Sequence, residues 1–399
     1  MPNTPDSGVE EVDLWNAEDA SDLERPKSAS DYNIAIAARD WTVETIVQQV
    51  RQGNIDLDPA FQRRNAWRDP RRSRLVESFI LGFPVPQIVL AENPHKKKTF
   101  IVIDGKQRLM TIAGLYLNGF RGYWTQPRLS GLNVLKELNR VSLDDFMSGS
   151  EYSTERRQLG NADIRTTVIT GFSDEAVLYD IFYRINTGSV PLSSQELRQV
   201  LNQGDFAKYL IDITSRPNPL WRLLGVESPD PRLRDVELLL RLVAWRRFSR
   251  EYIGNMKPFL DEAMNRLNNR WASERVPIEA LVGQLLRGAQ AASQVFGAHA
   301  GRKFKEGRFE ASLNRALFEV QVYYFSFRQI RETARTKKKA VVVAFKELSG
   351  DGEFLNSIES TTKSIENYRI RFDKYRRMLR RVLGIEPEAL PLRSSTRGR

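Results

Sequence analysis

Residues 101–108, with the sequence IVIDGKQR, carry the strongest chemical signal in the chain. An apolar run ends at Asp104-Gly105, and a helical pattern begins directly afterwards. The first N–H groups of a helix attract anions, and glycine lets a ligand approach the backbone closely. Lys106 and Arg108 add positive charge where helices usually favour acids. The pattern predicts an anion site, with Asp104 able to hold a metal ion or position water. The alternative is an ordinary strand–helix turn with solvated basic side chains.

Two further segments combine arginine with amide or aromatic side chains. Residues 61–68 read FQRRNAWR, where arginine forks suit phosphates and the indole of Trp67 can stack on a base. Residues 182–188 read FYRINTG, where Arg184 and Asn186 lie near the expected end of a helix. The alternatives are a surface loop with Trp67 folded onto the core, and simple helix C-capping by the glycine.

The charge distribution indicates a polyanionic partner. Residues 1–31 carry nine acidic and two basic side chains, so the other 368 residues have a net charge of +18. Nucleic acid is the usual partner of such a basic body. On a helix expected over 361–383, we take Arg376, Arg377 and Arg380 as candidate contacts to a DNA backbone. The alternative for these arginines is a solvated face of a bundle helix.

The composition excludes several kinds of chemistry. The chain has no cysteine, so disulfides, thiol nucleophiles and Cys-type metal sites are excluded. Its two histidines, His95 and His299, lie far apart, which argues against a catalytic triad or a His-type nuclease motif. There is no P-loop pattern. Because there is neither a long apolar run nor a secretory signal, we expect a cytoplasmic protein with no membrane partner.

The elements that must position these residues form two main regions. We expect an acidic disordered arm over 1–30, a mixed α/β domain over 31–204, a helical domain over 205–390 and a basic tail over 391–399. Capping and periodicity predict the following elements in chain order: a helix capped by Thr42, a helix capped by Asp69 with Pro70 at its first position, a hairpin of 87–91 with 100–103, a helix after Gly105, a less regular insertion over 120–162, a strand over 164–169, a capping box at 193–196, and helices over 235–249, 256–270, 275–296, 309–332 and 361–383.

Four blocks of sequence together resemble the domain-of-unknown-function-262 family. They read FQRRNAW, LVESFILGFPVPQIVLAE, VIDGKQRLMTI and FYRINTGSVPLSSQEL, in this order over 61–197. The family includes the GmrS subunit of GmrSD-type modification-dependent restriction enzymes and the front half of SspE-type anti-phage effectors. RDVELLLRLVAW, and the helix that follows STTKSIENYRIRFDKY, are similar to the helical half of stand-alone members.

The resemblance implies that the α/β domain is ParB/sulfiredoxin-like, which gives an α+β chain with an all-helical second domain. The family's Asp-Gly-Gln-Gln-Arg motif serves nucleoside-triphosphate (NTP) binding and hydrolysis, and Lys106 departs from its commonest form. The catalytic residues implied by this motif are Asp104, Lys106, Gln107 and Arg108, with Mg²⁺ held by Asp104. The implied nucleotide-binding residues are Gln62, Arg63, Gly105, Arg184 and Asn186. The DNA-binding candidates are Arg64, Trp67, Arg376, Arg377 and Arg380.

We therefore expect a nucleotide-dependent DNA-binding component of a bacterial anti-phage restriction system that hydrolyses NTP. Its expected partners are DNA, including modified phage DNA, and a separate nuclease subunit, because this chain lacks the histidines of a His-Asn-His nuclease. Self-association stays open. One alternative is a non-catalytic nucleotide-sensing or DNA-binding module that licenses a partner nuclease. Another is a metal-dependent DNA nickase, using Glu77 with Asp104 and Lys106.

Overall fold

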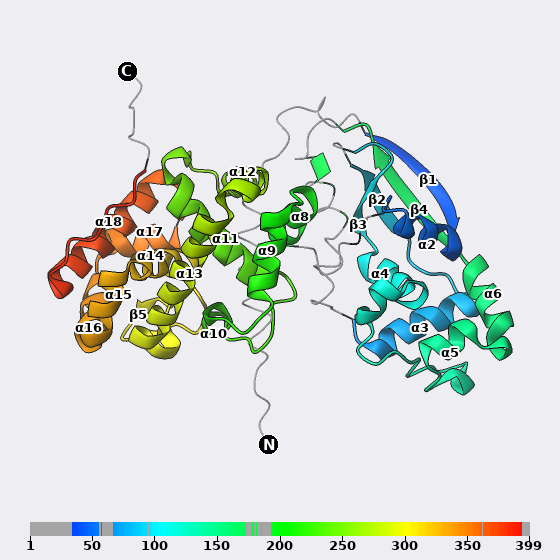
Figure 1. The fold of residues 1–399 in the computed structure, drawn as a ribbon. Helices are drawn as coiled ribbons and strands as arrows, with labels where there is room; N and C mark the ends of the chain where they lie inside the picture. The colour runs from blue at the N-terminus through cyan, green and yellow to red at the C-terminus, as the bar shows by residue number, and fades with distance from the viewer. Residues whose placement is uncertain are drawn as a thin grey trace. The chain divides into compact units, whose positions relative to one another are not determined.

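The computed structural model describes residues 34–55, 57, 67–93, 96–172, 177–178, 181, 185, 193–360 and 362–392. Contacts divide the chain into two units at Leu192/Ser193. Figure 1 shows a small sheet with helices in the first unit and mostly helices in the second. The predicted fold class, a mixed α/β region followed by a helical region, is confirmed. The domain boundary predicted at 204/205 lies 12 residues beyond this division, on the other side of one short helix.

Four strands form the sheet of the first unit, in the order β1–β4–β2–β3. They are β1 (Ala35–Thr42), β2 (Ile88–Glu92), β3 (Phe100–Asp104) and β4 (Asp163–Thr170). β2 and β3 form the predicted antiparallel hairpin, with Leu90 opposite Val102. β4 runs antiparallel to β1 and parallel to β2. Because β2 and β3 are almost entirely buried, the end of β3 is held firmly by the core.

β1 is a strand that the sequence patterns do not predict. Its residues, AIAARDWT, show no regular alternation of polar and apolar types, and six of the eight are exposed. All eight pair with β4, from Ala35 opposite Thr170 to Thr42 opposite Asp163. Backbone pairing with β4, rather than burial of one face, therefore defines this strand.

Several α-helices whose bounds the structure describes accompany the sheet, and Figure 1 shows α3, α4, α5 and α6 grouped beside one another. The helices are α2 (Val43–Arg51), α3 (Asp69–Ile80), α4 (Lys106–Tyr116), α5 (Leu143–Ser148) and α6 (Ser153–Asn161), with 3₁₀ turns η3 (Asn118–Tyr123), η4 (Lys136–Leu138) and η5 (Ser150–Tyr152). One hydrophobic core joins them to the sheet, from Ile46 of α2 and Phe79 of α3 to Leu109 of α4 and Val168 of β4. The segment interpreted as a less regular insertion therefore consists of short helices that share this core.

The helix starts test the capping predictions. Thr42 caps α2 as predicted, because its Oγ1 accepts a hydrogen bond from Thr45 N at 3.1 Å. The prediction that Asp69 caps α3 is wrong, since Arg68 is the N-cap and Asp69 is the first helical residue. The carboxylate of Asp69 instead accepts hydrogen bonds from Thr125 N and Gln126 N, in a segment far along the chain.

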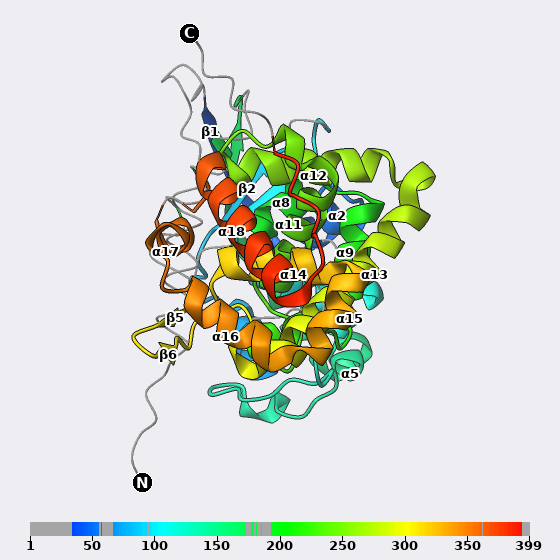
Figure 2. The same ribbon diagram turned by 90° about the vertical axis from the view of Figure 1, so that its left-hand side faces the viewer.

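The second unit contains eleven α-helices among the described residues. They are α8 (Ser194–Leu201), α9 (Asp205–Thr214), α10 (Pro219–Leu224), α11 (Arg234–Phe248), α12 (Met256–Asn269), α13 (Trp271–Phe296), α14 (Arg315–Ser326), α15 (Arg328–Thr336), α16 (Lys338–Leu348), α17 (Gly352–Glu359) and α18 (Ile365–Leu383), with 3₁₀ turns η7 (Ser249–Glu251) and η8 (Gly297–His299). The capping box predicted at the start of α8 is confirmed, with Ser193 and Glu196 each accepting from the other's backbone N–H. Figure 2 shows α15, α16 and α18 side by side, in agreement with their contacts.

The single helix predicted over 309–332 is wrong. A two-stranded hairpin, β5 (Phe304–Lys305) with β6 (Arg308–Phe309), precedes α14. Asn314 then caps α14, since its Oδ1 accepts from Leu317 N at 2.9 Å. Phe327 has an extended backbone and separates α14 from α15. Periodicity continues through these residues because both helices bury apolar side chains, so only the backbone at Phe327 reveals the break.

The core of the second unit is rich in aromatic residues. Trp245 of α11 contacts Tyr252, Phe259 and Tyr368, with ring centroids 4.1 to 5.2 Å from its own. Such ring pairs add stability beyond the area that they bury. None of the helices in the described ranges combines the length and apolar character needed to cross a bilayer.

Candidate functional site

The turn between β3 and α4 has the strand–glycine–helix form predicted for residues 104–106. Gly105 is the N-cap of α4 and has a φ of +93°. A Cβ atom at this position would lie 2.9 Å from Cγ1 and 3.3 Å from Cα of Ile88. Glycine is therefore required here both by the left-handed backbone and by the close approach of β2.

The first turn of α4 is electropositive. Gly105 offers no side chain to cap the helix, and the turn contains no acidic residue. Lys106 and Arg108 both lie in it, and Lys106 is partly exposed. Because a helix N-terminus carries partial positive charge and unpaired N–H donors, this end of α4 suits an anion.

Arg108 forms an internal ion pair with Asp104. Its Nη2 donates to Asp104 Oδ2 and to Gln87 O, both at 2.9 Å. The Arg108 side chain is 13% exposed and that of Asp104 is 38% exposed. The pair fixes the start of α4 against the residue before β2, and it partly neutralises the positive charge of the turn. An incoming anion must share Arg108 with Asp104 or displace one bond of this pair.

Two polar atoms of the turn are buried and lack a hydrogen-bond partner among the described residues. They are Gln107 Oε1 and Arg108 Nε. An unpaired buried polar atom costs about 1–3 kcal/mol, so such atoms usually have water or a ligand as partner. One acceptor and one donor beside an electropositive helix end are suited to a hydrated phosphate group.

Asp104, the last residue of β3, supplies a carboxylate directly before Gly105. Mg²⁺ commonly takes one or two protein carboxylates and completes its shell with water and substrate phosphates. No group of three or more acidic or histidine side chains that could hold a metal ion occurs in the described ranges. The residues therefore fit Mg²⁺ bound together with phosphate oxygens, and do not fit a site made by protein ligands alone.

Five of the predicted site residues lie outside the described residues. They are Gln62, Arg63, Arg64, Arg184 and Asn186. Their roles in nucleotide or DNA binding stay predictions, and the description of the site is limited to the β3–α4 turn.

Trp67 has internal contacts. Its ring is partly buried against the core of the first unit, and the guanidinium carbon of Arg71 lies 4.4 Å from the ring centroid. These contacts match the alternative in which Trp67 folds onto the core. Base stacking by Trp67 stays a prediction.

The three arginines of α18 proposed for DNA contact lie next to acidic residues. Arg376 pairs with Asp373 at 2.9 Å and with Glu386 at 2.6 Å. Arg377 also pairs with Asp373, and Arg380 with Glu386. Arg377 and Arg380 remain largely exposed, but each shares an acid that reduces its local positive charge. Contact with DNA at these residues stays a prediction.

A polar stripe on α3 is a feature that sequence reasoning missed. Asp69, Ser73 and Glu77 follow one another at four-residue spacing, and all three are buried. Ser73 Oγ accepts from Ser130 N at 2.9 Å. The carboxylate of Glu77 accepts from the backbone N–H groups of residues 133–135 at 2.8 to 3.3 Å. The stripe therefore holds the segment 125–135 on α3, and the spacing of polar residues was the available signal.

The environment of Glu77 explains its ionisation. Burial by itself raises the pKa of a carboxyl group, but the three N–H donors and nearby Arg74 hold the pKa of Glu77 below its usual value. The charged form is thus stabilised by the fold. Glu77 is thus occupied by main-chain donors, and its role in a nickase stays a prediction.

We expect Glu77→Gln to destabilise the protein by about 1–3 kcal/mol at neutral pH, because charge-assisted hydrogen bonds are lost. Since the folded-state pKa of Glu77 lies below the unfolded value, its contribution is present above the unfolded pKa and disappears as the pH falls through the folded one. Urea unfolding of the wild type and of Glu77→Gln at several pH values measures this difference in the free energy of unfolding. Glu137→Gln, at an exposed position two residues after the segment 125–135, is the control. An equal loss of stability in Glu77→Gln and Glu137→Gln would contradict the stabilising role of Glu77.

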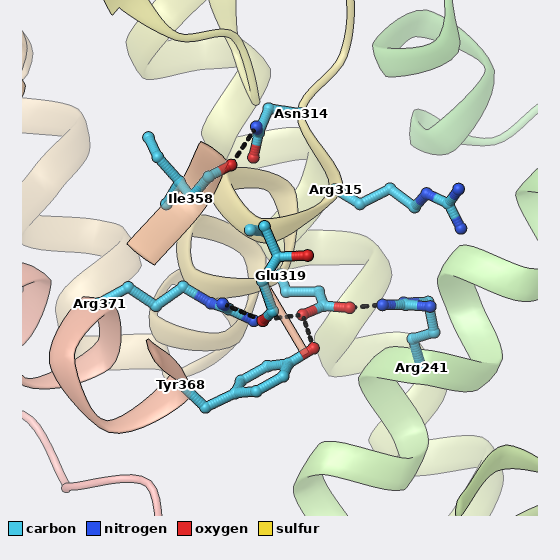
Figure 3. A pocket seen from close by; sticks show the side chains of 9 residues that line it. Arg241, Asn314, Arg315, Glu319, Ile358, Tyr368 and Arg371 are labelled. Carbon is cyan, nitrogen blue, oxygen red and sulfur yellow. Dashed lines mark hydrogen bonds and ion pairs between the residues drawn. The ribbon is translucent and has the colours of Figure 1, made fainter. Parts of the chain in front are cut away.

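A buried cluster of charges lies in the second unit and was also not predicted. Figure 3 shows Glu319 between Arg241 on one side and Arg371 with Tyr368 on the other. Glu319 Oε1 accepts from Arg241 Nε at 2.5 Å, and its Oε2 accepts from Tyr368 Oη at 2.7 Å. Arg241 also pairs with Glu237, which Arg315 contacts at 3.1 Å. The cluster links α11, α14 and α18.

The space left within this cluster is small. The cavity of about 10 Å³ matches the room taken by one water molecule and excludes larger ligands. Burial raises the pKa of a carboxyl group, but Arg315, Arg241 and Arg198 hold the pKa of Glu237 below its usual value. The cluster is therefore a structural ion-pair network and not a second candidate for the site.

Residues 43–201 match the family model described as GmrSD restriction endonuclease, N-terminal domain. No curated protein and no solved structure matches the chain. The matched range contains β2, β3, α4 and the Gly105 turn, and it extends through α8. The match supports a component of a restriction system, as the sequence resemblance predicts.

Proposed function

We propose that the chain is the nucleotide-dependent, DNA-binding component of a restriction system, and that it binds and hydrolyses NTP at Asp104–Arg108. The observation that carries this proposal is the electropositive start of α4, where Gly105 brings the backbone against β2 and leaves the first turn without a side-chain cap. The match to the GmrSD N-terminal domain supports the restriction context.

In this proposal the β3–α4 turn receives the phosphate oxygens. The N–H groups of the first helical turn donate to them, and Lys106 and Arg108 offset their charge. Asp104 would hold Mg²⁺, which when bound neutralises charge on the phosphates. Gln107, whose buried Oε1 lacks a partner among the described residues, would orient the attacking water molecule.

We expect Asp104→Ala and Arg108→Ala each to abolish NTP hydrolysis without unfolding the protein. Each removes charge at the phosphates, while the fold loses only their partly exposed ion pair and, in Arg108→Ala, one hydrogen bond to Gln87 O. Phosphate release with each NTP, with and without modified DNA, measures this. Asp144→Asn is the matched control, because Asp144 also pairs with an arginine of this unit, at 2.7 Å, but is 80% exposed. Unchanged turnover in both folded site variants would refute the catalytic assignment.

The ion pair of Asp104 with Arg108 favours a second candidate, a non-catalytic nucleotide sensor that licenses a partner nuclease. A carboxylate already paired with a guanidinium is a poorer ligand for Mg²⁺ than a free one. Calorimetric titration with NTP distinguishes the two proposals. Binding without phosphate release, weakened by Arg108→Ala, is expected for the sensor.

A further inference from the structure

A cleft in the second unit is lined by arginines from two helices. It encloses about 420 Å³ and is formed by Gln284 and Arg287 of α13 together with Ser326, Phe327, Arg328 and Arg331 at the α14–α15 junction. α13 and α15 lie side by side, as Figure 2 and their contacts show. This arginine cleft is not part of the proposed NTP site, because that site is formed by residues of the first unit.

The arginines of this cleft have little acidic compensation. Arg287 has no ion-pair partner among the described residues. Within the described ranges, Arg331 donates to the main-chain oxygens of Phe325 and Ser326, at 3.3 and 3.0 Å. Glu332, the acidic residue that acts on Arg331, is already paired with Arg328 at 2.8 Å. The cleft therefore holds more positive charge than the protein itself neutralises.

Two further features of the surroundings are consistent with this charge balance. Burial and the nearby charge of Arg287 lower the pKa of Arg331, although Glu332 opposes them. A fourth guanidinium, that of Arg246, contacts two residues that line the cleft: it donates to Ser326 Oγ at 2.7 Å and lies 4.3 Å from the ring centroid of Phe327. Like charges that repel one another in a cleft are stabilised by a bound anion.

The surface next to the cleft continues this charge. Residues 328–339 contain six basic side chains and a single acidic one. Arg335, Lys338 and Lys339 are exposed along the α15–α16 connection. A row of cations that leads away from a cleft suits a polymer of phosphates better than a single small anion. The exposed α18 arginines, in contrast, are paired with Asp373 and Glu386.

We propose that the arginine cleft binds a phosphodiester group of a nucleic-acid backbone, with Arg287, Arg328 and Arg331 on the phosphate oxygens. The basic residues over 335–339 then follow the same strand. Arginine forks match phosphate geometry, and contact to the backbone gives affinity without base specificity. The identity of the polymer as DNA rests on the proposed function, whereas the location of the site does not.

The test is fluorescence anisotropy of a labelled DNA duplex with the full chain, without NTP, over a series of salt concentrations. We expect Arg287→Gln with Arg331→Gln to weaken binding about tenfold and to reduce the slope of log Kd against log salt by about two. Since Arg331 also holds two carbonyl groups, Arg287→Gln alone is measured in parallel, with an expected slope reduction of about one. Arg270→Gln with Arg275→Gln is the control, because Arg270, directly before α13, and Arg275 of α13 are exposed and each pairs with a glutamate.

Three outcomes would overturn the assignment. They are wild-type affinity and slope in both cleft variants, an equal loss in the control variant, and no binding of DNA by the wild-type chain. Competition with inorganic phosphate and with NTP separates the sources of phosphate, and displacement of DNA by either at millimolar concentration would assign the cleft to a free anion. Because NTP hydrolysis is measured separately, the DNA-binding result can be interpreted even if the NTP proposal fails.

Discussion

Glu319→Ala is expected to destabilise the second unit by about 3–5 kcal/mol, the usual cost of breaking a buried ion pair by removing one partner. The carboxylate of Glu319 is fully buried. Its removal leaves Arg371 without a carboxylate and Arg241 with Glu237 alone. Tyr368 also loses the acceptor of its hydroxyl hydrogen bond. Uncompensated charge would then remain between α11, α14 and α18.

Chemical unfolding followed by circular dichroism measures this cost. Glu332→Ala is the matched control, since Glu332 pairs with Arg328 by a similar distance but on the surface, where such a pair contributes about 0.3–0.5 kcal/mol. Similar losses for the two variants would show that the buried network does not stabilise the unit. Because the fold lowers the pKa of Glu237, the contribution of this network should fall as the pH drops through that pKa.

Gly105→Ala is expected to destabilise the first unit and to abolish NTP binding at the β3–α4 turn. A left-handed conformation costs an L-residue about 1–2 kcal/mol. In addition, the new Cβ would meet Ile88 at a distance that real structures do not show, so β2 or the start of α4 must move. A displaced first turn no longer directs its N–H groups at the same point, and the bond from Arg108 to Gln87 O is strained with it.

Gly53→Ala separates the two causes. Gly53 also has a positive φ, of 69°, but a Cβ there would meet nothing within 4 Å. We expect Gly53→Ala to show only the conformational cost, with NTP binding unchanged in calorimetric titration. If Gly105→Ala binds NTP as the wild type does, the close approach of β2 is not needed for the site.

The sequence predicts those parts of the fold where local chemistry decides the structure. The β2–β3 hairpin, the start of α4 at Gly105 and the capping box at Ser193 all follow from residues that are neighbours in the chain. β1 could not be predicted in this way, because it depends on pairing with residues 163–170. The role of Asp69 could not be predicted either. Its carboxylate accepts from the N–H groups of residues 125 and 126, which are distant in sequence, and does not cap α3.

The sequence predicts the backbone form of the β3–α4 turn but not the pairing of its side chains. The sequence IVIDGKQR predicts a strand, a glycine and a helix in this order, and it shows that two basic residues lie in the first turn of the helix. The bond of Arg108 to Asp104 and the buried Gln107 oxygen depend on the rotamers that packing selects. In the second unit, Arg287 and Arg331 come together because α13 packs against α15, which no spacing in the chain reveals.

The order of strands also constrains how the chain acquires its structure during synthesis. Of the four described strands of this sheet, β1 is made first, but it pairs with β4, which is made last. The β2–β3 hairpin can form early from local contacts, whereas the sheet closes only when residues 163–170 arrive between β1 and β2. Such non-local pairing is slow and leaves strand edges open in the nascent chain. A fragment that stops before Asp163 should therefore aggregate, even though it contains the whole Gly105 turn.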